Sequence, residues 1–233
     1  MNLFFNTKED EITYYKKHFR KIKNTDNSRY YNRKSLKNII IKDGIEFIGM
    51  CTFKYCKNLK KIILPNSVKK IGDEAFEGCW NLEEIVFPEE LEFIGKRTFY
   101  GCESLKRIVI PKNVKEIDLA AFKDCENLEE IVLPEELECI GESAFSNCKG
   151  LKRIVIPRSV EKICDRAFIN CKNIEEIVLS EALKIIGEYA FTGCANIKRI
   201  TIPRNVKKIC DGAFENCEKL EEIVLPEELD FIG

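Results

Sequence analysis

The stretch LEEIVLPEELECIGESAFSNCKGL, residues 128–151, decides the fold of this 233-residue chain. Its first part, LEEIVLP, is rich in the aliphatic residues of a strand with one buried face, and Pro134 ends that strand because it has no amide to donate. A second extended piece, 137–140, leads through Gly141 into ESAFSNC, which is long enough for about one turn of helix. The inward residues that we expect in this unit are Leu128, Ile131, Leu133, Ala144, Phe145 and Cys148.

The same apolar pattern returns every 23 residues, with no insertions, from Leu36 onward. Chance does not maintain such spacing, so the chain is a repeat array. All seven prolines occupy one repeat position, as expected for strand ends. The columns are the aliphatic residues Leu36, Leu59, Leu82, Leu105, Leu128, Leu151, Ile174, Ile197 and Leu220; the phenylalanines Phe53, Phe76, Phe99, Phe122, Phe145, Phe168, Phe191 and Phe214; and the cysteines Cys56, Cys79, Cys102, Cys125, Cys148, Cys171, Cys194 and Cys217.

A unit of 23 residues with about eight inward side chains cannot bury them alone, so successive units must stack and share one core. The array is therefore predicted to be a solenoid. Parallel strands stack at roughly 4.8 Å per turn, so about 8.5 repeats predict a rod on the order of 40 Å long.

Two polar positions add detail to each repeat. The residue before the column cysteine is Gly, Asn or Asp in seven of eight repeats, and these residue types tolerate a positive φ; only Tyr55 departs. Asn is common two positions after the cysteine, where its short side chain can bond to the backbone of the adjoining turn. These asparagines are Asn58, Asn81, Asn127, Asn173 and Asn196.

The pattern LxxIxLPxxLxxIGxxAFxxCxNL resembles the BspA-like leucine-rich repeats over nearly the whole chain from Leu36. The resemblance implies an α/β repeat solenoid: a right-handed coil with a parallel sheet on one face, short helical turns and extended segments on the other, and a binding or adhesion surface made by the stacked strands. It brings no catalytic residues, and many family members are secreted or on the cell surface. This chain departs from the pattern by having Lys42 and Ser180 where Pro is expected and Asp118, Cys164 and Cys210 where Gly is expected.

We expect two parts: an N-terminal cap or arm, residues 1–35, and a solenoid, residues 36–233, whose last repeat is incomplete. Thr7 and Asp10 form a capping box for a cap helix that shields the first repeat. The alternative is a basic aromatic arm that binds a partner or an anionic surface. The apolar face of the helix would hold Ile12, Tyr15, Phe19 and Ile22, and the only histidine, His18, is expected to be solvated.

The charged positions have a doubled period of 46 residues, because acidic repeats such as 128–137 alternate with basic ones such as 151–160, LKRIVIPRSV. In an in-register parallel stack identical charges would lie one turn apart and repel, whereas alternation gives every carboxylate two cationic neighbours. Each exposed pair contributes only about 0.2–1 kcal/mol. A slip by one turn would set Glu against Glu, so we expect the charges to specify register.

Twelve cysteines raise the question of disulfides or a metal. Column thiols lie about one turn apart, further than the roughly 3.5–4.5 Å between Cβ atoms that a disulfide prefers, and no CxxC spacing occurs. We expect reduced, buried thiols, no metal and no cofactor; the flanking basic repeats also compete with Ca²⁺ for the glutamates. Cys51, Cys139, Cys164 and Cys210 lie outside the column and are expected to be inert.

The composition narrows the class of partner. Lys and Arg total 38 against 39 Asp and Glu, which gives no general attraction to nucleic acid or anionic lipid. The chain has no apolar run of membrane-span length and no signal-peptide pattern at its start, so together with reduced thiols we expect a cytoplasmic protein; the alternative is the surface or secreted location of many family members.

No phosphate-binding loop or nucleophile elbow is present in the sequence, so we expect a binding protein rather than an enzyme. Its surface would be the outward strand positions, an apolar stripe bordered by charges that recognises a protein or peptide. The alternative is a structural or adhesive spacer from a longer array, able to self-associate end to end through its uncapped last repeat. The predicted surface is Glu84, Val86, Arg107, Val109, Glu130, Val132, Arg153, Val155, Glu176, Val178 and Arg199, with Thr201 beside the last of these.

Overall fold

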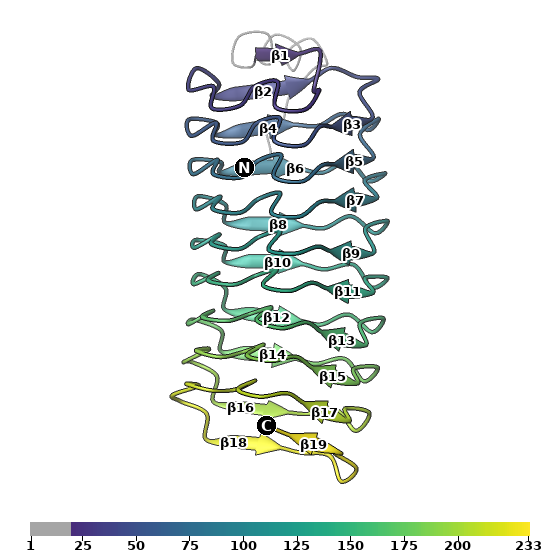
Figure 1. The fold of residues 1–233 in the computed structure, drawn as a ribbon, viewed down its shortest axis with the longest axis vertical. Helices are drawn as coiled ribbons and strands as arrows, with labels where there is room; N and C mark the ends of the chain where they lie inside the picture. The colour runs from purple at the N-terminus through teal and green to yellow at the C-terminus, as the bar shows by residue number, and fades with distance from the viewer. Residues whose placement is uncertain (1–19) are drawn as a thin grey trace, which may run out of the picture.

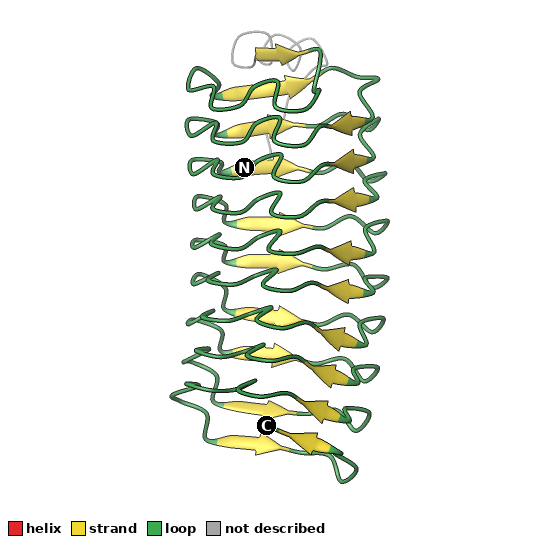
Figure 2. Ribbon diagram, viewed as in Figure 1, coloured by secondary structure: helices red, strands yellow, loops and turns green. Residues whose placement is uncertain are grey.

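The structure, a computed structural model, describes residues 20–233, and in that range the chain winds into a rod of stacked turns (Figure 1). Each of nine turns contributes two short strands, and one further strand, β1 (Arg20–Ile22), precedes them. All strand pairs are parallel. No helix occurs between residues 20 and 233, so the architecture is a parallel β-solenoid (Figure 2).

One face of the rod, here called the strand face, holds the first strand of every turn. Neighbouring strands are in register at 23 residues, as in the pairing of Arg153 with Glu176. In the three-residue strands of this face the middle residue points into the core, because side chains alternate along a strand; in the four-residue strand β2 the second and fourth residues are buried. The strands are β2 (Asn38–Ile41), β4 (Lys61–Ile63), β6 (Glu84–Val86), β8 (Arg107–Val109), β10 (Glu130–Val132), β12 (Arg153–Val155), β14 (Glu176–Val178), β16 (Arg199–Thr201) and β18 (Glu222–Val224).

The second extended piece of each repeat forms a second file of two-residue strands on another side of the rod. The isoleucine of each strand is directed into the core in every turn but the last. These strands are β3 (Phe47–Ile48), β5 (Lys70–Ile71), β7 (Phe93–Ile94), β9 (Glu116–Ile117), β11 (Cys139–Ile140), β13 (Lys162–Ile163), β15 (Ile185–Ile186), β17 (Lys208–Ile209) and β19 (Phe231–Ile232).

A single core runs through the rod, as the repeat pattern predicts. Its centre is the phenylalanine column, in which each ring stacks on the next with centroids 5.2–5.5 Å apart and planes within 12° of parallel. Tyr30 extends this stack by one ring beyond Phe53, at 5.4 Å. The leucine column and the second-strand isoleucines belong to the same core.

The segment that was predicted to be a short helical turn is not a helix. In residues 141–148, amides that bond locally alternate with amides that bond to the next turn. Phe145 N donates to Ala167 O at 2.8 Å, for example, and Ser146 N donates to Ser143 O at 3.1 Å. Ser143 has φ +55° and Asn147 has φ +60°, and left-handed residues so close together interrupt a right-handed helix.

The positive φ predicted for the residue before each column cysteine is confirmed in all eight repeats. Tyr55, the one departure in residue type, also has a positive φ, 59°. The sequence did not indicate the second left-handed position, four residues earlier, because its residue types are mixed. That position holds Cys51, Glu74, Arg97, Ala120, Ser143, Arg166, Tyr189 and Gly212.

The predicted N-terminal helix is largely outside the described residues, as are Thr7, Asp10 and His18. The part of it that is described is not helical: Ile22 is buried in β1, which pairs with β2. Residues 27–32 then form the same kind of turn as the later repeats, with Tyr30 in the phenylalanine column. This turn was not predicted from the sequence, because Tyr30 and Arg33 replace the column Phe and Cys.

Candidate binding surface on the strand face

The structure places the predicted binding residues together on the strand face. Each acts as the first or last residue of a strand whose middle residue is buried, so its side chain points outward. Those so placed are Glu84, Val86, Arg107, Val109, Glu130, Val132, Arg153, Val155, Glu176, Val178, Arg199 and Thr201.

Five valines form a continuous file along this face. Their exposed fractions lie between 36% and 55%, which is high for a β-branched apolar residue. The outward positions of the second strands differ, because apolar Phe93 is followed by charged Glu116 and then by Cys139 and Lys162. The valine file is therefore the longer uninterrupted apolar surface; its members are Val86, Val109, Val132, Val155 and Val178.

The charges beside the valines pair in twos rather than in a continuous ladder. Arg107 Nε lies 3.0 Å from a carboxylate oxygen of Glu130, and Arg153 Nε lies 2.6 Å from one of Glu176. Glu130 has no ion pair with Arg153, its neighbour on the other side, among the described residues. The prediction that every carboxylate gains two cationic neighbours is therefore wrong on this face.

The hydrogen bonds of the strands explain this pairing. β8 bonds to β10, β12 to β14 and β16 to β18, but in the described chain no ladder joins β6 to β8, β10 to β12 or β14 to β16. Glu129 N donates to Lys106 O at 2.8 Å, whereas no corresponding bond links Lys152 N to Glu129 O within residues 20–233. Each basic strand is thus held to the acidic strand after it, and the doubled sequence period appears as a doubled structural period.

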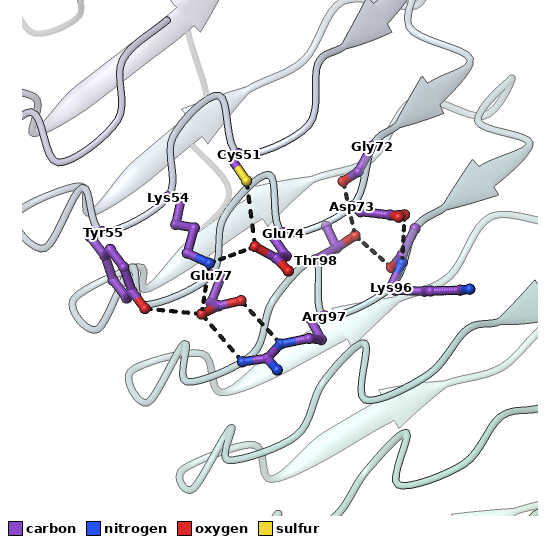
Figure 3. A network of polar contacts seen from close by, with 11 residues as sticks. Cys51, Lys54, Tyr55, Gly72, Asp73, Glu74, Glu77, Lys96, Arg97 and Thr98 are labelled. Carbon is purple, nitrogen blue, oxygen red and sulfur yellow. Dashed lines mark hydrogen bonds and ion pairs between the residues drawn. The ribbon is translucent and has the colours of Figure 1, made fainter. Parts of the chain in front are cut away.

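A second polar cluster, on the turn side of the rod, was missed by the sequence analysis (Figure 3). The carboxylate of Glu77 has a side-chain exposure of only 3% and is surrounded by donors. Lys54 Nζ, Arg97 Nε and the Tyr55 hydroxyl each lie 3.1 Å from one of its oxygens. Lys54 also donates to Glu74 at 2.5 Å. The departure at Tyr55 was the available sequence signal, since that ring carries one of the donors.

This cluster is saturated rather than reactive. Two acids face two bases, and the described residues contain no buried side-chain nitrogen or oxygen without a hydrogen-bond partner. The hydrogen bond from Lys54 holds the pKa of Glu74 below its usual value. Burial opposes the charge of Lys54, but its bonds to Glu74 and Glu77 outweigh that and raise its pKa. Glu74 and Lys54 therefore both stay charged near neutral pH, and their ion pair holds neighbouring turns together.

The column cysteines are free thiols with a specific partner each. Every sulfur donates to the carbonyl oxygen of the column aromatic residue one turn earlier, over 3.0–3.4 Å. Burial raises the pKa of Cys56 and of Cys217 to about 11. Outside the column, burial and the adjacent thiol of Cys164 raise the pKa of Cys139 to about 12. These shifts disfavour the nucleophilic thiolate.

Residues 20–233 contain no cluster of three or more metal-ligating side chains. That part of the chain also lacks a helix long and apolar enough to cross a membrane.

Residues 23–152 and 115–233 match the BspA type leucine rich repeat region. The chain belongs to this family. BspA-type proteins are repeat solenoids that are typically not enzymes, and they are often at the cell surface.

Solved structures of similar proteins share the fold. A leucine-rich repeat protein from Bacteroides ovatus is 30% identical, with a TM-score of 0.78 over 87% of this chain and 58% of its own. A leucine rich repeat protein from T. pallidum is 32% identical, with a TM-score of 0.65 over 68% of this chain and 77% of its own. A leucine rich cell surface protein from Faecalibacterium prausnitzii, 24% identical with a TM-score of 0.50, covers 90% of this chain and 77% of its own. No curated protein matched the chain.

Proposed function

We propose that this BspA-type protein recognises another protein or a peptide through its strand face. The observation that carries the proposal is the continuous file of exposed valines bordered by charged side chains. Contiguous apolar surface rimmed by polar groups is typical of protein interaction sites. Leucine-rich-repeat proteins generally bind proteins, which agrees with this assignment.

The face also suits binding because its backbone is fixed. The strands pack against one continuous core that contains the stacked rings, so the surface that a partner would bind is already ordered. Preorganisation reduces the entropy cost of association. Outward side chains can vary without disturbing the buried columns, which separates recognition from folding.

The test compares two triple variants with the same chemistry on different faces. Val132→Asp, Arg153→Glu and Val155→Asp alter the strand face, whereas Phe93→Asp, Cys139→Asp and Lys162→Glu alter the second-strand face. Partners are captured with the wild-type protein by cross-linking and then titrated against each variant. We expect the first variant to lose affinity about tenfold or more and the second to retain it.

Both variants must keep the wild-type circular dichroism spectrum and unfolding midpoint. Equal affinity of the wild type and the strand-face variant would contradict the proposal. It would favour instead a spacer, in which the length of the array matters more than the chemistry of one face.

A further inference from the structure

One junction of the solenoid differs from all the others in the described chain. The file of second strands is interrupted once between residues 20 and 233, separating β3–β5–β7 from β9 to β19. The strand-face ladder is interrupted at the same level, between β6 and β8. Between these two turns both ladders therefore stop, whereas the junctions from β10 to β12 and from β14 to β16 lose only the strand-face ladder.

The turn side still connects these two halves of the rod. Arg97 N donates to Leu119 O at 2.9 Å, and Phe99 N donates to Ala121 O at 2.8 Å. The rings of Phe99 and Phe122 stack at 5.2 Å across the junction. The two turns are thus held together at one side and spread apart at the strand face.

A cleft of about 770 Å³ occupies the space between β6 and β8. This volume is in the range of pockets that hold small ligands or short peptide segments. Val86, Phe87 and Val109 contribute its apolar surface. Phe87 stands where the equivalent repeats have Leu133 and Leu179, so an aromatic ring is special to this junction.

The two walls of the cleft have opposite charge. Glu83, Glu84 and Glu89 line the β6 side. The β8 side has Lys106, Arg107 and Lys112, and these six charged groups face one another across the apolar surface.

Several of these charges are available to a ligand. Glu83 and Glu84 pair with Lys60 and Lys61 in the preceding turn, and Arg107 pairs with Glu130 in the following one. By contrast, within the described structure Glu89, Lys106 and Lys112 form no ion pair. Each wall therefore retains at least one charge that is not neutralised by the protein itself.

We propose that this cleft binds an extended peptide segment of a partner protein in which basic and acidic residues alternate around an apolar one. In an extended chain successive side chains point to opposite sides, so a basic residue meets Glu89 while acidic ones meet Lys106 and Lys112. The apolar side chain packs on Phe87. This proposal rests on the proposed function and narrows the strand face to one junction.

The test uses a fluorescein-labelled twelve-residue peptide in which Lys and Glu alternate around a central Leu, titrated with the protein while anisotropy is measured. Control peptides of the same length are all-Lys, all-Glu, or alternating with Ser in place of Leu. We expect saturable binding of the first peptide, and affinities lower by about tenfold or more for the others.

Matched variants locate the site. Lys106→Glu with Lys112→Glu changes the cleft, and Lys152→Glu with Arg158→Glu changes the equivalent positions two turns later, which do not line this cleft. The first pair should reduce affinity about tenfold and the second less than about twofold. Phe87→Leu, which restores the residue type of the other repeats, should also weaken binding.

Other outcomes separate this proposal from the broader one. Equal losses from both variant pairs, or no binding of the alternating peptide, would overturn the cleft proposal and leave the strand-face function in place. Failure of the strand-face triple variant to affect the captured partner would overturn the broader function, whatever the peptide does.

Discussion

The sulfur of Cys125 lies 3.2 Å from the carbonyl oxygen of Phe99, 26 residues earlier and one turn back in the solenoid. Both residues are fully buried. The bond recurs in every column cysteine. Each of these carbonyl groups also accepts a bond from the backbone N–H three residues later, as Phe99 O does from Cys102 N at 3.0 Å, so the thiol is a second donor to a buried acceptor. The sequence predicts that these thiols pack as small apolar groups, and in the structure they are hydrogen-bond donors as well.

Replacing Cys125 tests the donor directly. Cys125→Ala removes the thiol donor, leaves the Phe99 carbonyl with only its bond from Cys102 N, and opens a small cavity, whereas Cys125→Ser keeps a second donor. We expect the Ser variant to be more stable than the Ala variant by about 1 kcal/mol. Urea unfolding of both variants measures the difference. If the Ala variant were the more stable, as at a purely apolar site, the hydrogen bond would have no net value.

The thiol column also predicts a loss of stability at alkaline pH. Burial raises the folded-state pKa of these thiols, to about 11 for Cys56 and Cys217, above an unfolded value of about 8.5. The unfolded state therefore releases its protons first. The contribution is fully present below about pH 8.5 and decreases as pH rises, by up to about 1.4 kcal/mol per pH unit for each thiol.

Urea midpoints between pH 7 and pH 10 would measure this decrease. The double variant Cys102→Ala with Cys125→Ala should show a shallower decline, because two of the groups with raised pKa are absent. The same decline in both proteins would assign the alkaline effect to other groups.

Much of the fold could be predicted because the inward columns repeat every 23 residues and only stacking buries them. The turn around Tyr30 and the non-helical form of residues 141–148 could not. Tyr30 lies in a divergent copy of the repeat, and AFxxC is equally compatible with a helical turn until its bonds to the next turn are known. The outward strand residues were located correctly because side-chain alternation fixes which side each residue faces.

Charge pairing on the strand face gives a directional prediction. Arg153 Nε lies 2.6 Å from a carboxylate oxygen of Glu176, and β12, which carries Arg153, is hydrogen-bonded to β14. In the described residues β10, which carries Glu130, is not hydrogen-bonded to β12. A double-mutant cycle for Arg153 and Glu176 should give a coupling of about 0.2–1 kcal/mol in low salt, and less in high salt. The matched cycle for Arg153 and Glu130 should give a value near zero. Equal couplings would support a continuous ladder instead of pairs.

The buried carboxylate of Glu77 predicts a larger effect than any strand-face charge. Glu77→Gln removes the charge that Lys54 and Arg97 share, so we expect a cost of roughly 3 kcal/mol in the free energy of unfolding. Tyr55→Phe removes one of its hydrogen bonds and should cost about 1 kcal/mol. Chemical denaturation measures both. A loss for Glu77→Gln no larger than that for Tyr55→Phe would show that the ion cluster adds little.

The interrupted ladders could not be predicted from the sequence, because the apolar columns keep their 23-residue spacing through the β6/β8 junction. The replacement of Leu by Phe at position 87 lies at this junction, but that substitution alone does not indicate a cleft. The sequence shows the alternation of charge, but it does not show whether each charged side chain pairs with the preceding or the following turn. That pairing depends on which strands are hydrogen-bonded.

The junction between β6 and β8 should also be the weakest interface in the rod. In a repeat protein stability is a sum of terms for single turns and for neighbouring pairs, so a junction without strand ladders depends on its core contacts. Phe99→Ala removes the ring that stacks on Phe122 across this junction, whereas Phe145→Ala removes one that stacks on Phe122 where both ladders are intact.

Each of these two substitutions should cost roughly 3–5 kcal/mol, but their unfolding should differ in form. Phe99→Ala should uncouple residues 20–95 from the turns after the junction, so amide hydrogen exchange would become faster in the first part while the second stays protected. In the Phe145→Ala variant, the amides of residues 20–95 should exchange at the same rate as those of the turn that follows them. Uniform acceleration along the whole rod in the Phe99 variant would show that the core alone makes this junction as strong as the others.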